Sequence, residues 1–185
     1  MLSTTEGNIF LPSRTSLINL LRRVPFHTGI NESILKLIKA AVDSMAPKDR
    51  YCQIMFDEMA LEPSLAFNTR KDIIIGFQDN GDEQTSNLFA DKAMVFMARG
   101  ICRKWKQVIE YYLNEGGMKK DILAVKIKEI VRAARSIGLK IVAIICGQAS
   151  ANISAIKQLY CETEQIYRRN KLENRNFGFE MTAKK

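Results

Sequence analysis

The sequence predicts an α/β fold in which a mixed β-sheet is flanked by helices. Two apolar stretches of strand length predict the sheet: Arg50–Met59, which carries two acids near its end, and Ile141–Cys146, which is continuously apolar. Between them, apolar residues recur at helical spacing in Lys119–Ile137. A strand, a crossover helix and a parallel strand form the usual right-handed unit of α/β proteins. This order therefore favours a partly parallel sheet.

Length and composition indicate one globular domain. The chain has 185 residues, of which 46% are hydrophobic and 26% charged, and these are ordinary globular values. The net charge of +8 is uneven, because acids outnumber bases by eight to four between residues 51 and 100 while bases dominate elsewhere. That layout suits a metal-binding centre beside a surface for polyanions. A solvated surface with uneven charge is the alternative.

The cysteines and the amino-terminal residues indicate the cellular compartment of the protein. The four cysteines form no C-x-x-C pair and His27 is the only histidine, so the sequence predicts no zinc site. Three of the cysteines lie in or beside apolar runs, and we expect core residues rather than disulfide partners. The first residues show no signal-peptide pattern, and no apolar run approaches the length of a membrane span. We expect a soluble intracellular protein.

Two helices are predicted before the first strand, and residues 1–49 form a helical lead-in. In Ser16–Val24 the apolar residues recur at helical spacing, and Pro25 ends the pattern. Asn31 is the predicted N-cap of a second helix, Glu32–Met45. An independent helical hairpin that binds a partner is the alternative interpretation.

The first strand carries the leading candidate residue. Turn-prone residues on both sides of Arg50–Met59 favour a strand over a buried helix, and they place Asp57 at its carboxyl end. Open sheets with parallel strands bind ligands at that edge. Asp57 therefore ranks above the other acids as a candidate for chemistry.

Further strands are predicted in the middle of the chain. Leu65–Phe77 has two short apolar runs around a polar turn at residues 68–71, which is typical of a hairpin. Asp79–Thr85 is an acidic loop that lacks the spacing of a calcium loop, so it is interpreted as a solvated turn. Ala93–Ala98 and Trp105–Leu113 are the next two predicted strands.

Two sets of basic residues are candidates for DNA binding. The first surrounds Trp105 and the second follows one face of the predicted Lys119–Ile137 helix. They are Arg99, Arg103, Lys104 and Lys106, and then Lys128, Arg132 and Arg135. Bases around an aromatic residue can neutralise and stack on nucleic acid. A lone tryptophan is more typical of a core, and basic ridges on helices are usually just solvated.

The last elements complete the predicted unit, which spans residues 50–170 and is followed by a polar tail, 171–185. Gly138 is the expected C′ residue of the Lys119–Ile137 helix. Ile141–Cys146 is expected to be a central strand covered on both faces. A final helix is predicted from about Ala149 to Tyr167, and Ile153, Ile156 and Tyr160 are expected to point inward.

This order of elements is that of a ribonuclease-H-like (RNase-H-like) fold. In that fold the first and fourth strands are neighbours, so Asp57 and the residue after Cys146 are expected to meet at one edge. Two carboxylates there, with a third acid from a later helix, would hold two magnesium ions for phosphoryl transfer. Magnesium requires hard oxygen ligands in nearly octahedral geometry.

Several stretches resemble the RNase-H-like domain of P-element-type transposases, the family that includes THAP-related proteins. They are RYCQIMFDEM, IIIGFQDNG, VFMARGICRKWKQVIEYYL and IVAIICGQASAN, preceded by the lead-in PSRTSLINLLRRVPFHTGINESIL. The resemblance extends from about Pro12 to Asn152. It implies a nuclear protein that acts on DNA, using magnesium held by an Asp, Asp, and Glu or Asp set. Asp57 corresponds to the first catalytic aspartate and metal ligand of that set.

One departure from the family pattern concerns the second acid. The family has a Cys-Asp-Gln type of sequence after the fourth strand, whereas this chain has Cys146, Gly147 and Gln148. Glycine has no side chain, so the second ligand is absent, Asp57 is a vestigial ligand, and magnesium is not expected to bind productively. The chain also stops at Lys185, before the region that supplies the third acid, so we expect a carboxyl-terminally incomplete fold.

These observations favour a transposase-derived fragment without DNA cleavage or strand-transfer activity. Its expected residual roles are weak DNA binding, self-association, or association with an intact transposase. One alternative is a part of an active magnesium-dependent transposase whose missing acids lie outside this chain, or are supplied by Asp79, Asp82 or Glu162. Another is a protein-interaction module.

Overall fold

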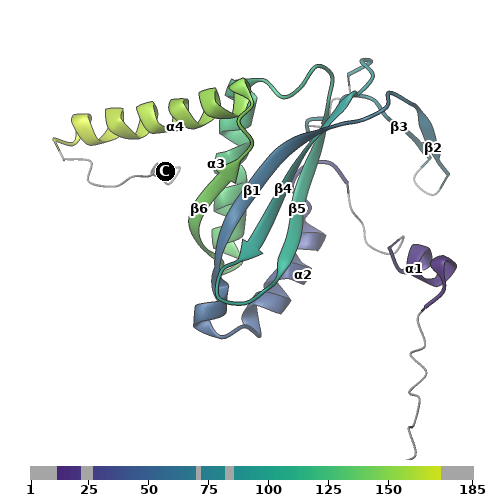
Figure 1. Ribbon diagram of the computed structural model, residues 1–185, viewed down its shortest axis with the longest axis horizontal. Coiled ribbons are helices and arrows are strands. Elements are labelled where there is room, and N and C mark those ends of the chain that lie inside the picture. Colours follow the sequence, from purple (N-terminus) through teal and green to yellow (C-terminus); the bar gives the residue numbers. More distant parts are fainter. Residues whose placement is uncertain (1–11, 22–26, 70–71, 82–85, 172–185) are drawn as a thin grey trace, which may run out of the picture.

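The computed structural model describes residues 12–21, 27–69, 72–81 and 86–171 (Figure 1). The elements in chain order are α1 (Arg14–Leu21), α2 (Glu32–Asp43), the 3₁₀ turn η1 (Pro47–Arg50), β1 (Tyr51–Ala60), β2 (Ala66–Asn68), β3 (Ile73–Ile75), β4 (Lys92–Gly100), β5 (Lys106–Asn114), α3 (Lys120–Ser136), β6 (Lys140–Cys146) and α4 (Ser150–Arg169). Four strands form one sheet in the order β5-β4-β1-β6, and β2 and β3 form a separate hairpin.

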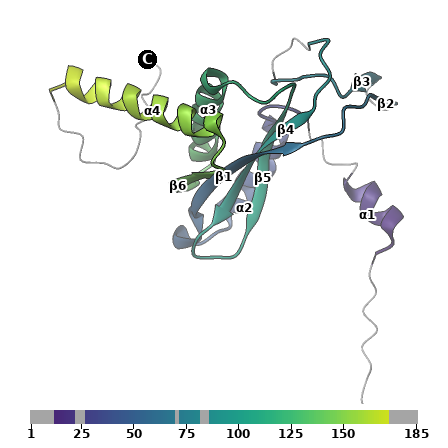
Figure 2. The same cartoon turned by 45° about the horizontal axis from the view of Figure 1, so that its top comes forward.

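The main sheet is mixed, as the sequence predicts. β1 pairs antiparallel with β4 and parallel with β6, and β4 pairs antiparallel with β5. The parallel pair needs a crossover, which α3 provides. Figures 1 and 2 show α2 and α3 on the same face of the sheet. The α/β architecture with helices flanking a mixed sheet is therefore confirmed.

The core lies between this face of the sheet and the two helices. In the first part of β1 every second residue is buried, namely Cys52, Ile54 and Phe56. Phe56 contacts Phe96 of β4, with ring centroids 5.0 Å apart. Helix α3 contributes the predicted stripe, and all its members are buried: Leu123, Ile127, Ile130, Ala134 and Ile137. Each buried aliphatic side chain of this kind contributes about 1.5–3 kcal/mol relative to an exposed one.

Helix α2 belongs to the same core although it lies in the predicted lead-in. Ile34, Ile38 and Val42 are buried and pack into the cluster formed by the sheet and α3. The predicted N-cap is confirmed, because the Asn31 side chain accepts hydrogen bonds from the backbone N–H groups of Ser33 and Ile34 at 2.9 and 3.2 Å. The lead-in helix thus covers part of the sheet.

The position of β6 differs from the prediction. In the described residues it is an edge strand, paired only with β1, and it is not covered on both faces. Val142 is 54% exposed and Ile145 is 43% exposed. An uninterrupted apolar run shows that a segment is apolar on both sides but does not show how many neighbours it has. The expectation of a central, doubly covered strand is therefore wrong for this structure.

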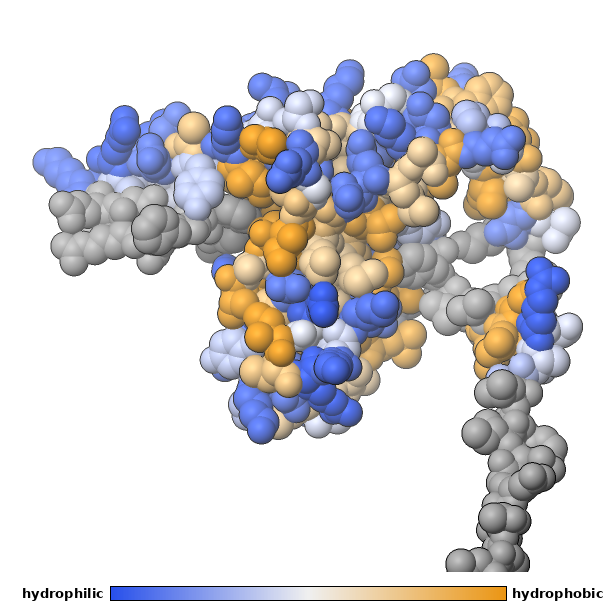
Figure 3. Space-filling model, viewed as in Figure 1, coloured by the Kyte–Doolittle hydropathy of each residue, from blue (hydrophilic) through white to orange (hydrophobic). Residues whose placement is uncertain are grey.

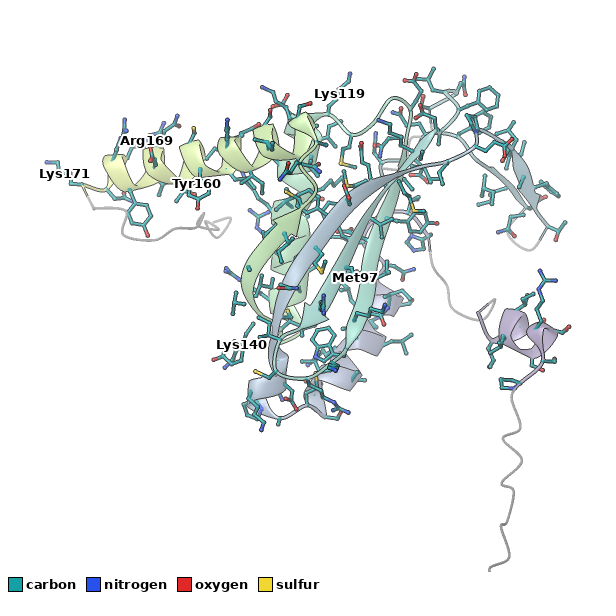
Figure 4. The ribbon with its side chains drawn as sticks, in the orientation of Figure 1. Met97, Lys119, Lys140, Tyr160, Arg169 and Lys171 are labelled. Atoms are coloured by element: carbon teal, nitrogen blue, oxygen red, sulfur yellow. The ribbon has the colours of Figure 1, made fainter. Side chains whose placement is uncertain are left out.

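The buried face of α4 also differs from the prediction. Ile153 is 42% exposed and Tyr160 is half-buried, whereas the fully buried positions are Asn152, Ala155, Leu159 and Thr163. Figure 4 shows Tyr160 projecting from α4. Ile156, the third residue predicted to point inward, is partly buried and packs against the core. The prediction therefore holds for Ile156 and is wrong for Ile153 and Tyr160.

All four cysteines are free. Cys52 is buried and Cys146 is half-buried, while Cys102 and Cys161 are exposed. The prediction that they are not disulfide partners is confirmed. The prediction of three core cysteines holds for Cys52 and for Cys146, which packs against the core, and is wrong for a third, because proximity to an apolar run in sequence does not determine which way a side chain points.

Some predicted features lie outside the described residues. These are Val24 and Pro25, the middle of the hairpin turn at 70–71, residues 82–85 of the acidic loop, and the tail after residue 171. Within the described ranges, no helix combines the length and apolar character needed to cross a membrane.

The turn between β4 and β5 is fixed by Trp105, and Gly100 permits this. The Trp105 indole N–H donates to the carbonyl of Asp49 at 3.1 Å, and its backbone carbonyl accepts from the Gly100 N–H at 2.9 Å. A Cβ on Gly100 would lie 2.3 Å from the indole Nε1 and 2.5 Å from the Arg103 carbonyl oxygen. The inference that Trp105 packs against the core rather than lying free is confirmed.

We expect Gly100→Ala to lower the free energy of unfolding by about 1–3 kcal/mol, the usual cost of overpacking a tight site. The added methyl group meets backbone as well as side chain, so it cannot be relieved by a rotamer change alone. Urea denaturation followed by Trp105 fluorescence measures the change. Gly116→Ala is a useful comparison, because a Cβ there meets no atom within 4 Å, although its φ of +68° adds backbone strain. An unchanged unfolding midpoint for Gly100→Ala would contradict this account of the turn.

Candidate functional site

The candidate site lies at the carboxyl ends of β1 and β6. The last residue pair of the parallel ladder is Phe56 with Cys146, and Asp57 and Gly147 follow directly. A Cβ built on Gly147 would lie 2.5 Å from Asp57 Oδ1 and 3.0 Å from Asp57 Oδ2. The predicted adjacency of the two strand tips is therefore confirmed.

Asp57 is exposed, and its carboxylate folds over the glycine. Its Oδ1 atom accepts a hydrogen bond from the Glu58 backbone N–H at 3.0 Å. The carboxylate occupies the space that a side chain at position 147 would need. Beside it, the pKa of the Cys146 thiol is raised by burial and, secondarily, by the negative charge of Asp57. The thiol is thus protonated at neutral pH.

Asn152 holds the turn that carries Gly147. Its side chain is 1% exposed, and its Nδ2 donates to the Gly147 carbonyl at 3.2 Å. Within the described residues, the buried Asn152 Oδ1 has no hydrogen-bond partner. Sequence reasoning missed this residue because it expected Ile153 to point inward. A polar residue in the first turn of a helix that follows a strand tip was the available indication.

Glu58, the second acid of β1, does not share the site. Its carboxylate accepts from the Met118 backbone N–H at 2.6 Å and lies 3.7 Å from the Lys92 ammonium. Neighbouring residues of a strand point to opposite faces. Glu58 therefore anchors the loop before α3, while Asp57 points to the other side.

The other acids that could have replaced the missing second carboxylate do not lie at the Asp57 edge in the described residues. Glu162 accepts from Lys128 and from Gln158, and the pKa of its carboxyl is lowered chiefly by the hydrogen bond from Lys128. It lies twelve residues into α4 from Ser150, which is roughly 18 Å along the axis. Asp79 accepts from the Thr28 hydroxyl and pairs through its backbone with Leu113 on β5, the far edge of the sheet. Asp82 is outside the described residues.

Magnesium does not fit the residues present at this edge. Asp57 supplies one carboxylate, position 147 supplies none, and the Cys146 thiol is a soft ligand, whereas magnesium requires several hard oxygens. Among the described residues, no group of three or more His, Cys, Asp or Glu side chains is arranged to hold a metal ion.

The two predicted sets of basic residues differ in their surroundings. Arg99, Arg103, Lys104 and Lys106 are all exposed on and around the β4–β5 turn. That turn lies at the opposite end of the sheet from Asp57, because β4 runs antiparallel to β1. On α3, the Lys128 ammonium is engaged by Glu162, Arg132 is half-buried and Arg135 is exposed.

Comparisons with known proteins agree with this architecture. The family described as "TNP-like, RNase H N-terminal domain" matches residues 26–160. The Transposable element P transposase of Drosophila melanogaster is 27% identical over 142 residues, which is 77% of this chain and 16% of that protein. The chain thus spans about a sixth of this relative.

A solved structure described as the Drosophila P element transposase strand transfer complex superposes with a TM-score of 0.58 and 25% identity. The match covers 80% of this chain and 29% of the solved chain. The family match covers well over half of the chain, and the relative and the solved structure both carry the P element transposase name. The chain therefore belongs to the TNP-like RNase H N-terminal domain family and is an RNase-H-like domain of the P-element transposase type.

Proposed function

We propose that this transposase-derived domain does not itself cleave or join DNA and that it retains DNA binding. The observation that carries the proposal is Gly147 beside Asp57, with no second carboxylate at that edge among the residues that the structure describes. Phosphoryl transfer by two metal ions needs ligands that hold both cations and offset their charge. A backbone carbonyl or a water molecule can contact a cation but supplies no negative charge.

The relative and the solved structure motivate the DNA-binding part of the proposal. Both are transposases by description, and the solved one is a strand transfer complex. An RNase-H-like domain of this type with a net charge of +8 is suited to contact DNA phosphates. Association with an intact transposase, self-association and a nuclear location are parts of the same proposal, because DNA and transposase would be met there.

We expect the purified protein to show no magnesium-dependent or manganese-dependent cutting or joining of duplex DNA above the level of Asp57→Asn. A supercoiled plasmid assay detects nicking sensitively, and a labelled oligonucleotide assay detects joining. Gly147→Asp alone is not expected to rescue activity, because no third acid reaches Asp57 in the described residues. Metal-dependent cleavage that disappears in Asp57→Asn would overturn the proposal.

A further inference from the structure

One end of the sheet is strongly basic. It lies where β1 and β6 begin and where β4 turns into β5. We call it the basic end, and its residues are Lys48, Arg50, Arg99, Arg103, Lys104, Lys106 and Lys140. Three of these positions, Lys48, Arg50 and Lys140, are distant in sequence from the β4–β5 turn. Figure 3 shows hydrophilic side chains gathered over the lower end of the sheet.

Strand pairing brings these cations together. Arg99 on β4 lies opposite Lys106 on β5. Arg99 is also opposite Gln53 of β1, and Tyr51 of β1 lies opposite Lys140 of β6. The Ile101 N–H donates to the Tyr51 carbonyl at 3.0 Å, which attaches the β4–β5 turn to the start of β1. The indole bond from Trp105 to Asp49 attaches the same turn to η1, which contains Lys48 and Arg50.

Most of these cations are available to a partner. Apart from Arg50, all are exposed, and within the described residues none of them forms an ion pair with an acid. Arg50 donates to the carbonyls of Met45 and Asp43 and contributes charge rather than a free side chain. The Lys140 ammonium lies 4.9 Å from the centroid of the Tyr51 ring, a solvent-facing contact that leaves its donors accessible.

The row of cations has a size that matches a DNA backbone. Lys140 is displaced along the strand direction from the Arg99–Lys106 pair, because Gln53 faces Arg99 whereas Tyr51 faces Lys140. Across the strands, the three steps from β5 to β6 amount to about 14 Å. This is the axial length of roughly four base pairs. The row is also separate from the Asp57 edge, because Asp57 lies six residues further along β1 than Tyr51, a separation of about 20 Å. Figure 4 shows Lys140 and Lys119 at opposite ends of the fold.

The surroundings of Trp105 indicate whether the basic end would contact bases or phosphates. Trp105 is half-buried, its indole packs on Gly100, and the indole N–H donates a hydrogen bond to the Asp49 carbonyl. It is therefore not free to stack on an unpaired base, which is how aromatic residues bind single strands. The exposed aromatic residue at the basic end is Tyr51, which is 38% exposed, and the Lys140 ammonium lies over its ring. These features favour phosphate contacts without base readout.

We propose that the basic end binds the phosphate backbone of double-stranded DNA, independently of sequence and away from the Asp57–Gly147 edge. This inference rests on the DNA binding in the proposed function and assigns it a location. It adds Lys48, Arg50 and Lys140 to the residues that the sequence indicated. Because the basic end is separate from the Asp57–Gly147 edge, DNA binding there would not depend on the missing second acid.

The test is fluorescence anisotropy of a labelled duplex of about 30 base pairs, titrated at salt concentrations from about 50 to 200 mM. We expect the Arg103→Glu/Lys104→Glu variant to bind on the order of tenfold more weakly and to reduce the slope of log K against log salt by about 2. The matched control is Lys119→Glu/Lys120→Glu, which reverses two exposed charges at the other end. It is expected to retain nearly all of the wild-type affinity.

The outcomes separate the location from the proposed function. If the wild-type protein binds no duplex, the DNA-binding part of the proposed function fails. If it binds and only the Lys119/Lys120 control weakens, the location is wrong and the proposed function stands. Displacement of the duplex by polyglutamate at equal charge concentration, or much tighter binding of single strands, would also overturn the assignment to duplex phosphates. Thermal unfolding of each variant, with Arg103→Gln/Lys104→Gln as a milder second pair, excludes misfolding as the cause.

Discussion

Replacing Glu110 with glutamine is expected to stabilise the protein by roughly 3 kcal/mol at pH 8. Glu110 lies on β5, is fully buried, and its pKa is raised from 4.5 to about 7, chiefly by burial. Its Oε2 accepts from the Tyr112 hydroxyl at 2.7 Å, which opposes the rise. Within the described residues, its buried Oε1 has no hydrogen-bond partner.

The raised pKa of Glu110 determines how the stability of the wild-type protein changes with pH. The folded protein binds the Glu110 proton more tightly than the unfolded chain does. The contribution of this group to stability is therefore fully present below about pH 4.5 and is lost as the pH rises through about 7. Above that pH the wild-type protein must keep a charged carboxylate in the core, where desolvation is costly. Glutamine keeps the shape and an acceptor for Tyr112 without the charge.

Chemical denaturation at a series of pH values measures the effect. We expect the free energy of unfolding of the Glu110→Gln variant to vary less between pH 5 and pH 8 than that of the wild type, with the two proteins similar near pH 5. Glu115→Gln, an exposed change one residue beyond the same strand, serves as the control and should leave the pH profile unchanged. A wild-type protein that is at least as stable as Glu110→Gln at pH 8 would contradict the buried-carboxyl explanation.

Gly147→Asp is expected to create a divalent-metal site that the wild-type protein lacks. The Gly147 backbone is not in the left-handed region, so an aspartate is compatible with it. The new Cβ would displace the Asp57 carboxylate, which is exposed and attached to a rotatable side chain. Two carboxylates would then face each other at one edge, and without a cation their repulsion raises the pKa of one of them and lowers stability at neutral pH.

Thermal unfolding with and without manganese or magnesium is the measurement. A cation that binds the folded state alone stabilises it by about 2.7 kcal/mol at a concentration one hundred times its dissociation constant. We expect this gain for Gly147→Asp and none for the wild type. Gly147→Asn is the matched control, because it has the same size without the second charge. Equal metal-dependent gains in the wild type would show that Asp57 and its present neighbours already form a site.

Much of the fold and the central pair of the site follow from sequence. Three features are determined by residues close together in sequence. They are the strand that carries Asp57, the buried stripe of α3 and the N-cap at Asn31. Their patterns are local and can therefore be recognised in one chain. The meeting of Asp57 and Gly147 is expected because this order of elements is that of an RNase-H-like fold, in which the first and fourth strands are neighbours, and the parallel pairing of β1 with β6 confirms it.

The tertiary structure decided what depends on neighbours distant in sequence. Whether β6 is central or an edge strand depends on which strands pair with it, and its own apolar residues are the same in either case. The side of α4 that faces the fold buries Asn152 rather than Ile153, and there the Asn152 side chain donates to the Gly147 carbonyl. Strand register, which brings Lys140 beside Tyr51 and Arg99 opposite Lys106, assembles the basic end. Sequence by itself determined which residues carry charge, and the fold determined which charges face the same partner, because electrostatic attraction depends on distance in space rather than along the chain.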